Sequence, residues 1–449
     1  MPRFFISAAH KSSGKTVVST GLAAALSQSQ DVRTFKKGPD YIDPMWLSAA
    51  SGSPCYNLDF NTMPEAELLA LYTSRARGDI ALIEANKGLY DGVSLDGADS
   101  NAALAKLLKA PVVLVIDAVG TTRGIAPLLV GYQAFDPEVN IAGVILNKVG
   151  GPRHESKLRA AVEAYTDMPV IGAIGKHAAL EIGERHLGLT TPGETGEFKA
   201  TIAKIAEIVG GSVDLSALRS IAASAPALPM ATYAASATST KVKIGIARDT
   251  AFGFYYADDL EALKAAGAEL VFFNTLSDAR LPEIDGLFIG GGFPETQMAK
   301  LAANASLRAD IKAKIEAGLP TYAECGGLMY LCESLSWHGE THQMVGAVKG
   351  DAIMNARPQG RGYTRMKALG GIWESGTEVL AHEFHYARVD NLPEGTDFAY
   401  EVLRGHGIDG KNDGVLAYNM LAGFCHLRNS EATPWAARFV DFVQRKRLK

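Results

Sequence analysis

The chain has 449 residues, which predicts two or three domains of ordinary size. Hydrophobic residues make up 47% and charged residues 21%, as in a globular enzyme, and the net charge of -5 provides no basic field for a nucleic-acid partner. No apolar run approaches the roughly 18–20 residues that span a bilayer, so no membrane partner is expected. Four scattered cysteines fit neither a zinc site nor a disulfide framework and favour a cytoplasmic location.

From residue 1 to about 200, short apolar runs alternate with longer amphipathic stretches. The runs are rich in Val, Ile and Leu and end in a polar or small residue, which predicts strands at Arg3–Ala8, Ile80–Glu84, Val112–Asp117 and Ile141–Asn147. Continuous apolar strands separated by helices indicate a parallel sheet that is covered on both faces. Ligands bind such sheets at the carboxyl ends of the strands, so the polar residues there are the first candidates for a site.

The first predicted strand runs into the sequence AHKSSGKT at 9–16, and a helical stretch follows. Strand, loop and helix in this order are typical of a P-loop, whose backbone N–H groups and helix N-terminus cradle the phosphates of ATP. Ala9 replaces the first glycine of the usual pattern, and the alternative is an ordinary helix start with a Ser or Thr cap. The residues expected to bind ATP are Ser12, Ser13, Gly14, Lys15 and Thr16.

A magnesium ion would need oxygen ligands beside that loop. The Thr16 hydroxyl is one candidate, and Glu84 ends a predicted buried strand, as the acid of a Walker-B motif does. Asp40 and Asp43 lie in the segment KKGPDYIDP at 36–44 and complete the predicted Mg²⁺ site. The alternatives are a turn-capping carboxylate at Glu84 and ordinary Pro-Asp turn chemistry at the two aspartates.

Asn147 ends the last of the four predicted strands. Its side-chain amide carries both a donor and an acceptor, which suits the edge of adenine, so we expect it in the ATP site. The alternative is an ordinary turn residue.

A second α/β domain is predicted after a linker. Residues 221–240 are rich in Ala, Ser, Thr and Pro, with no charge and no helical period, as in an interdomain linker. An alternating pattern then resumes and predicts strands at Val242–Ala247, Glu269–Asn274, Gly286–Ile289 and Pro320–Ala323. The predicted domains are therefore residues 1–220 and 241–449.

The second domain contains a cysteine in the setting of a nucleophile elbow. Cys325 follows a predicted strand and precedes a helix, with small residues two positions before and after it. A tight turn there exposes the sulfur at a helix start, where the dipole and a nearby histidine favour the thiolate. Gly291 and Gly292 end an upstream strand and can turn N–H groups toward an oxyanion, together with Gly326. The alternatives are a buried structural cysteine and a flexible glycine turn.

The base that activates the cysteine is expected far along the chain. We select His426, which ends a late apolar stretch, from ten histidines. His382 and His385 lie in the sequence HEFHY, whose spacing differs from the His-Glu-x-x-His of zinc proteases. That segment is interpreted as a polar strand that faces a substrate.

Together these motifs resemble the cobyrinic acid a,c-diamide synthase family over nearly the whole chain. The resemblance rests on KxGPDYIDP, GLYDG at 88–92, ERHLGL at 184–189, GGGFPE at 290–295, YAECGGLMYL at 322–331 and HEFHY at 382–386. It implies a front domain similar to dethiobiotin synthetase and a rear domain similar to class I glutamine amidotransferases. It further implies that Cys325 and His426 release ammonia from L-glutamine, and that ATP with Mg²⁺ phosphorylates an acetate side chain of a tetrapyrrole. The front domain also makes a homodimer a candidate assembly.

The resemblance places the tetrapyrrole against Tyr41, Lys87, Tyr90, Asp91, His382 and His385. The chain departs from the common family pattern at Asn86–Lys87 and at Arg428, where many members carry Val-Met and histidine. The first departure, with Trp46, resembles homologues that amidate sirohaem or a sirohydrochlorin. Both a cobyrinic-type ring and a sirohaem-type ring are therefore candidate substrates. A P-loop ATPase switch without amidotransferase activity is the alternative from another class, and it leaves Cys325 unexplained.

Overall fold

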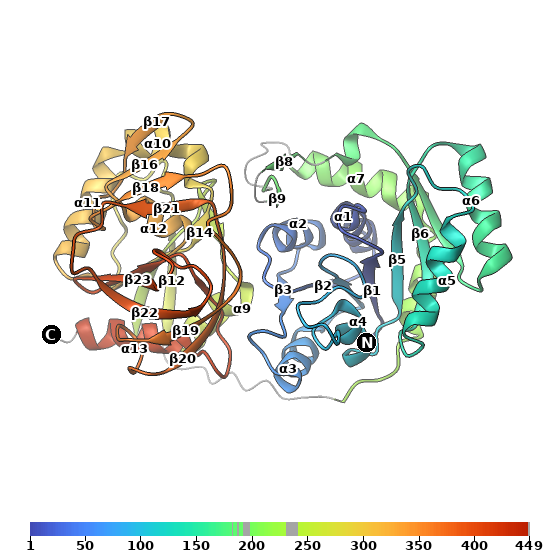
Figure 1. The fold of residues 1–449 in the computed structure, drawn as a ribbon, viewed down its shortest axis with the longest axis horizontal. Helices are drawn as coiled ribbons and strands as arrows, with labels where there is room; N and C mark the ends of the chain where they lie inside the picture. The colour runs from blue at the N-terminus through green and yellow to red at the C-terminus, as the bar shows by residue number, and fades with distance from the viewer. Residues whose placement is uncertain (182, 186–187, 192–197, 230–240, 448–449) are drawn as a thin grey trace. The chain divides into compact units, whose positions relative to one another are not determined.

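The computed structural model describes residues 1–181, 183–185, 188–191, 198–229 and 241–447. The chain forms two compact units, Met1–Tyr233 and Ala234–Lys449 (Figure 1). The division falls inside the predicted linker, of which residues 230–240 lie outside the described parts, as do residues 186–187 of the ERHLGL motif. The linker prediction began too early, because helix α8 (Leu215–Ala223) continues past residue 220. Asp214 caps that helix through two backbone N–H groups, and Ala222 is buried on its inner face.

The first unit is built on a seven-stranded sheet in the order β3-β2-β4-β1-β5-β6-β7, in which every neighbouring pair is parallel. The predicted parallel sheet is confirmed, and the fourth predicted strand extends two residues further, to Val149. Three strands of this sheet were missed: β2 carries several charges, β3 has four residues, and β7 contains two glycines. The strands are β1 (Arg3–Ala8), β2 (Val32–Lys37), β3 (Cys55–Leu58), β4 (Ile80–Glu84), β5 (Val112–Asp117), β6 (Ile141–Val149) and β7 (Val170–Gly175).

Helices cover both faces of this sheet. Right-handed crossovers place helices on opposite faces when the chain moves toward opposite edges. Figure 1 shows α1, α2 and α7 together over one face. The helices are α1 (Lys15–Ser27), α2 (Ile42–Ser51), α3 (Glu65–Arg75), α4 (Asn101–Leu107), α5 (Ile125–Phe135), α6 (Pro152–Tyr165), α7 (Phe198–Ser212) and α8, with a short η1 (Ala178–Leu180) and the hairpin β8 (Glu184–Arg185) and β9 (Gly188–Leu189). The carboxyl ends of β1, β2, β4 and β6 consequently lie at one edge of the sheet, where a ligand can reach them.

The second unit contains a ten-stranded mixed sheet in the order β12-β10-β13-β15-β24-β23-β22-β19-β20-β25. Its first five strands are parallel and its remaining strands are antiparallel. The predicted α/β pattern describes the parallel half. Of the antiparallel half, only the strand that contains His382 and His385 was predicted. The strands are β10 (Val242–Ala247), β12 (Ala268–Phe273), β13 (Gly286–Ile289), β15 (Thr321–Glu324), β19 (Gly360–Ala368), β20 (Glu378–His385), β22 (Asp397–Arg404), β23 (Asn412–Ala417), β24 (Met420–Gly423) and β25 (His426–Leu427).

Two apolar cores lie against this sheet, one around Leu287, Ile289 and Leu328 and the other around Ile244, Tyr322 and Trp435. The covering helices are α9 (Ala257–Ala265), α10 (Met298–Ala303), α11 (Ala305–Glu316), α12 (Gly326–Leu331) and α13 (Trp435–Arg447), with a short η3 (Pro294–Gln297). Smaller sheets pair β11 (Phe252–Phe254) with β14 (Gly291–Gly292) and join β16 (Ser334–Trp337), β17 (Glu340–Gln343), β18 (Asp351–Met354) and β21 (Ala387–Asp390).

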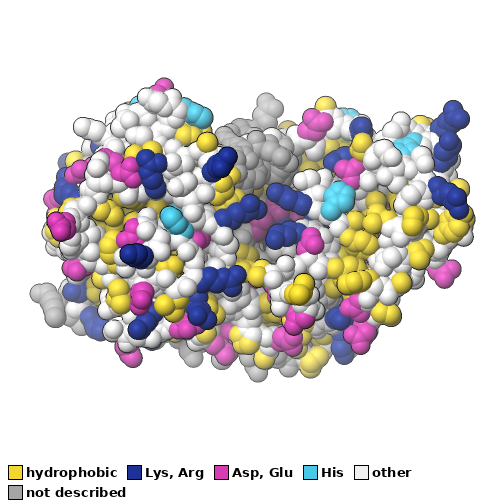
Figure 2. Space-filling view, in the orientation of Figure 1, with side chains coloured by type: hydrophobic (Ala, Val, Ile, Leu, Met, Phe, Trp, Pro, Cys, Tyr) yellow, Lys and Arg dark blue, Asp and Glu magenta, His cyan; other side chains and the backbone are white. Residues whose placement is uncertain are grey.

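The surface of the protein is mixed in character. Figure 2 shows basic and acidic side chains interspersed with apolar and uncharged ones on the visible face. Among the described residues, no helix is both long enough and apolar enough to cross a membrane.

Candidate active site

The P-loop follows β1 directly and has the conformation of a binding loop. Gly14 precedes α1 with a φ of 87°, a left-handed value that glycine adopts without strain, and Ser12 also has a positive φ of 64°. No side chain caps the first turn of α1, so the alternative of an ordinary Ser- or Thr-capped helix does not apply. The first N–H groups of α1 therefore remain for a ligand such as phosphate. Ser13 and Lys15 are buried beside them.

Thr16 and the end of β4 are joined in the way the predicted metal site requires. The Thr16 hydroxyl donates to Oε1 of Glu84 at 3.0 Å. The other oxygen of Glu84 is buried and has no hydrogen-bond partner in the described part of the chain. Asp43 lies at the start of α2, so two carboxylates and a hydroxyl meet at this edge of the sheet.

Lys36, for which no role was predicted, lies between these carboxylates. Its ammonium group is 2.8 Å from Glu84 and 2.5 Å from Asp43, and it is 3.8 Å from Asp40. Burial alone would lower the pKa of Lys36, but Asp43 and Glu84 raise it above its ordinary value. Burial raises the pKa of Glu84 while Lys36 lowers it. With an ammonium at 2.8 Å, we treat Glu84 as ionised.

Asp40 has a structural part in the same cluster. Its Oδ1 accepts the backbone N–H of Asp43 at 3.0 Å, while Asn57 donates to the carbonyl oxygens of Gly38 and Asp40. Burial, and then the charge of Asp43, raise the pKa of Asp40 to about 7. The turn-chemistry alternative thus describes this contact of Asp40, whereas Asp43 faces the cluster.

Lys15 shares this environment. Burial, and then the charge of Lys36, lower the pKa of Lys15 to about 8. Asp91 is among the groups that raise it again, and its Oδ2 accepts the backbone N–H of Gly88 at 2.8 Å. Gly88 itself lies against Ala9, where a Cβ would come within 2.6 Å of the carbonyl oxygen. The GLYDG motif therefore packs directly on the P-loop.

The other predicted substrate residues of this unit differ in accessibility. Lys87 is exposed and has a φ of 39°. Tyr90 is half-buried, and its hydroxyl donates to the carbonyl of Tyr132 at 2.6 Å. Tyr41 is buried, and Trp46 is 1% exposed, with its indole N–H donating to Thr190. Lys87 and Asp91 are thus the exposed residues among those predicted to contact a substrate here, whereas Tyr41 is buried and Tyr90 half-buried.

Asn147 and its neighbour hold the P-loop. The Asn147 amide donates to the carbonyl of Ser13 at 2.9 Å, and Lys148 donates to the carbonyl of Ser12 at 3.2 Å. Lys148 also forms an ion pair with Asp117 at the end of β5. The described contacts of Asn147 are therefore with protein backbone, and its predicted contact with adenine stays a prediction.

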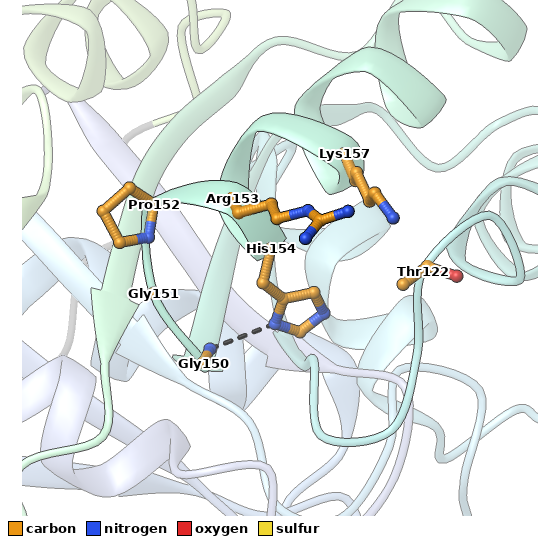
Figure 3. Close-up of a pocket in the computed structure, with 7 residues that line it drawn as sticks. All are labelled: Thr122, Gly150, Gly151, Pro152, Arg153, His154 and Lys157. Carbon is orange, nitrogen blue, oxygen red and sulfur yellow. Dashed lines mark hydrogen bonds between the residues drawn. The ribbon is translucent and has the colours of Figure 1, made fainter.

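A cavity of about 400 Å³ opens just beyond β6 (Figure 3). Both ring nitrogens of His154 are engaged, one accepting from the N–H of Gly150 at 3.0 Å and the other 2.6 Å from the carbonyl of Thr121. Arg153 and Lys157 project from the start of α6 toward the loop that carries Thr122. The cavity lies at the same edge of the sheet as the P-loop and is compatible with the nucleoside part of a nucleotide.

In the second unit, Cys325 occupies the tight turn between β15 and α12. Its φ and ψ are 49° and -102°, a strained conformation for a residue with a side chain. The turn needs glycine beside it, because a Cβ on Gly327 would overlap the carbonyl of Ile289 and one on Gly326 would come within 3.0 Å of the Gly292 nitrogen. This is the geometry of a nucleophile elbow, but the cysteine is buried, at 5% exposed, and not exposed as the sequence predicted.

The triple-glycine loop lies next to the elbow. Gly290 donates its N–H to the hydroxyl of Tyr255 at 3.0 Å, which fixes the start of the loop. A Cβ on Gly291 would come within 2.6 Å of Cε1 of His426, so the loop, the elbow and the histidine enclose one space. The backbone of Gly292 and that of Gly326 lie close together, and their role at an oxyanion stays a prediction.

His426 lies between Cys325 and Glu324. Its side chain is hydrogen-bonded to Cys325, and its Nδ1 is 3.5 Å from Oε2 of Glu324. Burial alone would lower the pKa of His426, but the hydrogen bond and charge of Cys325, and then those of Glu324, raise it to about 10. The His382 ring stacks on His426 with centroids 5.0 Å apart. Burial, and then the charges of His426 and Arg428, hold the pKa of His382 well below its ordinary value.

His385 does not share this space. Residues three apart on a strand point to opposite faces, so His382 and His385 of β20 cannot line one surface. His385 is 2% exposed, stacks on Phe424 at 3.9 Å, and has Nδ1 2.7 Å from the carbonyl of Ala387. The expectation of a strand with both histidines facing a substrate is therefore corrected, and His382 alone accompanies the cysteine.

Comparisons with known proteins agree with this division into two reaction centres. Residues 243–433 match the model of the CobB/CobQ-like glutamine amidotransferase domain, and residues 58–182 match that of an AAA domain, a span that begins after the P-loop. A cobyrinate a,c-diamide synthase of Magnetococcus marinus is 45% identical, over 98% of this chain and 97% of the relative. The chain belongs to the cobyrinate a,c-diamide synthase family.

Other members of the family are similar over the same length. The cobyrinate a,c-diamide synthase of Methanosarcina acetivorans is 42% identical over 98% of this chain and 95% of its own. That of Archaeoglobus fulgidus is 40% identical over 100% and 98%. As a member of this family with a glutamine amidotransferase domain, the chain is an ATP-dependent ligase that takes its amide nitrogen from glutamine.

Proposed function

We propose that this chain converts the a and c acetate carboxylates of a cobyrinic-acid-type tetrapyrrole into amides, with ATP as the activating reagent and glutamine as the nitrogen donor. The observation that supports it best is the presence of two chemically different centres in a chain that aligns end to end with cobyrinate a,c-diamide synthases. One centre is suited to nucleotide phosphates and the other is a strained cysteine bonded to a histidine.

In the glutaminase half of the reaction, the Cys325 thiolate attacks the amide carbon of glutamine. The N–H groups near Gly292 and Gly326 would stabilise the oxyanion that forms. His426 then gives its proton to the leaving nitrogen, which departs as ammonia, and water hydrolyses the thioester to glutamate. The buried setting of His426 keeps this proton from exchanging with bulk water before it is needed.

In the ATP half, a substrate carboxylate oxygen attacks the γ-phosphorus, ADP leaves, and an acyl phosphate results. Ammonia then attacks the carbonyl carbon, and phosphate leaves with the electron pair of the broken C–O bond. A free carboxylate does not react with ammonia in water, which is why activation is required. Lys15 and the N–H groups of the P-loop would hold the β- and γ-phosphates in line for this step.

Magnesium is part of the proposal. The Thr16 hydroxyl, Asp43 and Glu84 supply oxygen ligands of the kind that Mg²⁺ prefers, and the orphaned oxygen of Glu84 leaves one acceptor for it. These residues would hold the ion between the protein and the phosphates, where it neutralises phosphate charge. Lys36 would have to give up at least one of its carboxylate contacts when the ion binds.

The identity of the ring is the second part of the proposal, and a sirohaem-type or sirohydrochlorin-type ring is the alternative. Lys87 favours that alternative, because it is exposed next to the GLYDG motif and belongs to the segment in which the chain resembles homologues that amidate such rings. Trp46 gives no direct support, since its side chain is 1% exposed and its indole N–H donates to the carbonyl of Thr190. Reaction of the purified chain with each ring, ATP and glutamine, followed by mass spectrometry, decides between them by which ring gains two amides.

Two variants test the two-centre model. Cys325→Ala should lose glutaminase activity and glutamine-dependent amidation, yet still amidate the ring with a high concentration of ammonium. Lys15→Ala should keep glutamine hydrolysis and lose amidation with either nitrogen source. A P-loop ATPase switch without amidotransferase activity, the alternative of another class, requires instead that the wild-type chain hydrolyse no glutamine. A cytoplasmic location and a homodimer complete the proposal, and sedimentation of the purified chain tests the latter.

A further inference from the structure

Glu324 immediately precedes the reactive cysteine and is buried beside its histidine. The carboxylate is 3% exposed and ends β15, next to β24 in the centre of the ten-stranded sheet. Its Oε2 lies 3.5 Å from Nδ1 of His426, which is itself 3% exposed. A buried carboxylate at this distance from an imidazole favours a protonated Nδ1.

The other oxygen of Glu324 is held by two donors. Oε1 accepts the hydroxyl of Tyr322 at 2.6 Å and the backbone N–H of Leu427 at 2.8 Å. These two contacts fix the plane of the carboxylate, because one comes from its own strand and the other from the residue after His426. Oε2 is thereby presented to His426 rather than free to rotate away.

Arg428 and His382 also lie near His426, but neither can accept the hydrogen bond of Nδ1–H. Arg428, two residues further along the chain, is a permanent cation with no acceptor, and it pairs with Asp258 at 2.6 Å. His382 stacks on the His426 ring with an interplanar angle of 16°, so it lies above the ring rather than in its plane. A hydrogen bond to Nδ1 must come from within the ring plane, and Glu324 is the group that lies beside that nitrogen.

We propose that Glu324 is the positioning residue of the glutaminase centre, which holds Nδ1–H of His426 so that Nε2 faces the sulfur of Cys325. This inference rests on the proposed glutaminase activity. In the step it supports, the Sγ–H bond of Cys325 breaks and its proton moves to Nε2, leaving a thiolate and an imidazolium. Glu324 stabilises the imidazolium through its contact with Nδ1. The raised pKa of His426 has Glu324 among its causes, after burial and Cys325.

The test is Glu324→Gln, because it keeps the shape of the side chain. The glutamine oxygen can still accept from Tyr322 and Leu427, while its NH₂ group faces Nδ1 and favours the other tautomer of His426. That tautomer carries its proton on Nε2 and cannot accept one from Cys325. We expect kcat for glutamine hydrolysis to fall by about 10²–10⁴-fold with KM changed far less. The alkaline limb of the kcat/KM profile should move to lower pH, because the imidazolium loses its carboxylate.

Two further variants separate positioning from stability. Glu324→Asp retains a carboxylate and should recover at least tenfold of the activity lost in the glutamine variant. Glu383→Gln is a matched control, because Glu383 is also a buried carboxylate, 3.5 Å from Nε2 of a histidine, His385, in the same unit. This control is expected to lower the unfolding temperature and to leave the position of the pH limb unchanged.

The outcomes are distinguishable. If Glu324→Gln hydrolyses glutamine with the wild-type kcat and an unmoved pH profile, the positioning role is wrong while the proposed function stands. The positioning role is also wrong if the aspartate variant is as inactive as the glutamine variant. Ammonium-dependent amidation by each variant shows that the chain is folded. A wild-type chain without glutaminase activity would instead overturn the proposed function itself.

Discussion

The ammonium group of Lys36, at the end of β2, lies 2.8 Å from the carboxylate of Glu84 at the end of the neighbouring strand β4. Both side chains are buried, with 3% and 0% of their surface exposed. A lone carboxylate could not remain ionised there without a partner, because desolvation disfavours the charged form. Lys36 therefore neutralises the carboxylate charge of Glu84 at the edge of the sheet where we propose that a metal ion and phosphates bind.

Removal of Lys36 is expected to destabilise the first unit strongly. Lys36→Met keeps the length of the side chain but leaves Glu84 and Asp43 without their buried cation. Breaking a buried pair from one side costs about 3–5 kcal/mol. Denaturant titration of the full chain should show this loss in the free energy of unfolding.

A matched surface change controls for the loss of a lysine. Lys106→Met removes a pair with Asp136 in which both side chains are partly exposed, and such pairs contribute about 0–1 kcal/mol. Equal losses for Lys36→Met and Lys106→Met would contradict the charge-balancing role of Lys36.

The P-loop and Asn147 should be energetically coupled. A Cβ at Gly14 would overlap Nδ2 of Asn147, and the φ of 87° adds backbone strain. Gly14→Ala should therefore raise the KM for ATP by at least tenfold, whereas Asn147→Ala should raise it less. In the double variant the overlap is removed, so the cost of Gly14→Ala should shrink by about 1 kcal/mol in ATP binding. Strictly additive effects, measured by calorimetric titration, would show that the two residues do not touch.

Gly291 should be required for the position of His426. A Cβ at Gly291 would come within 2.6 Å of Cε1 of the imidazole, so Gly291→Ala displaces either the ring or the loop. We expect glutaminase activity to fall about 10²-fold, since misplacement by about 1 Å costs that much. Gly370→Ala is the control, because a Cβ there meets nothing within 4 Å and the φ is not positive. Both variants are assayed for ammonium-dependent amidation, which neither should lose.

His426 should make the stability of the protein fall with rising pH. Its pKa is raised to about 10 in the folded state by Cys325 and Glu324, against the opposing effect of burial, and is about 6.5 when unfolded. Between these values the folded state therefore keeps the His426 imidazole protonated, whereas the unfolded chain has lost that proton. The stabilisation is complete below about pH 6.5 and is lost as the pH rises through about 10. His382 and Arg428, the other groups on this side, carry no negative charge that would reverse the sign.

His426→Gln isolates this effect. The thermal unfolding of wild type and variant is measured at about pH 7 and at about pH 9.5. The wild type should lose more stability between these two pH values than the variant does. An identical pH dependence in the two proteins would show that His426 does not hold its extra proton in the folded state.

The parallel sheet could be predicted from sequence because its strands are buried on both faces. A strand covered on both faces must be apolar along its length, as in Val112–Asp117, and such runs stand out from amphipathic helices. Most of the antiparallel half of the second sheet was missed because β19 and β22 mix exposed and buried residues and carry several charges. Strands of that kind are specified by their partners across the sheet more than by their own composition.

Some of the site residues could likewise be predicted from sequence, and others could not. Cys325 was predictable because a strained turn admits few residue types, and the glycines that permit it are adjacent in sequence. The roles of Lys36 and Glu324 were not, because a charged residue at a strand end is ordinary until its partner is known. His385 was expected to face a substrate, yet it is 2% exposed and lies on the other face of β20 from His382.

The P-loop, the nucleophile elbow and the family could all be inferred before folding was considered, since each depends on residues that are neighbours in the chain or on similarity along its whole length. Only the folded chain shows which charges face one another: Lys36 with Glu84, and Glu324 with His426. Those contacts join strands distant in sequence. Their effect on proton affinity depends on burial and on a few ångströms of separation, which no local pattern encodes.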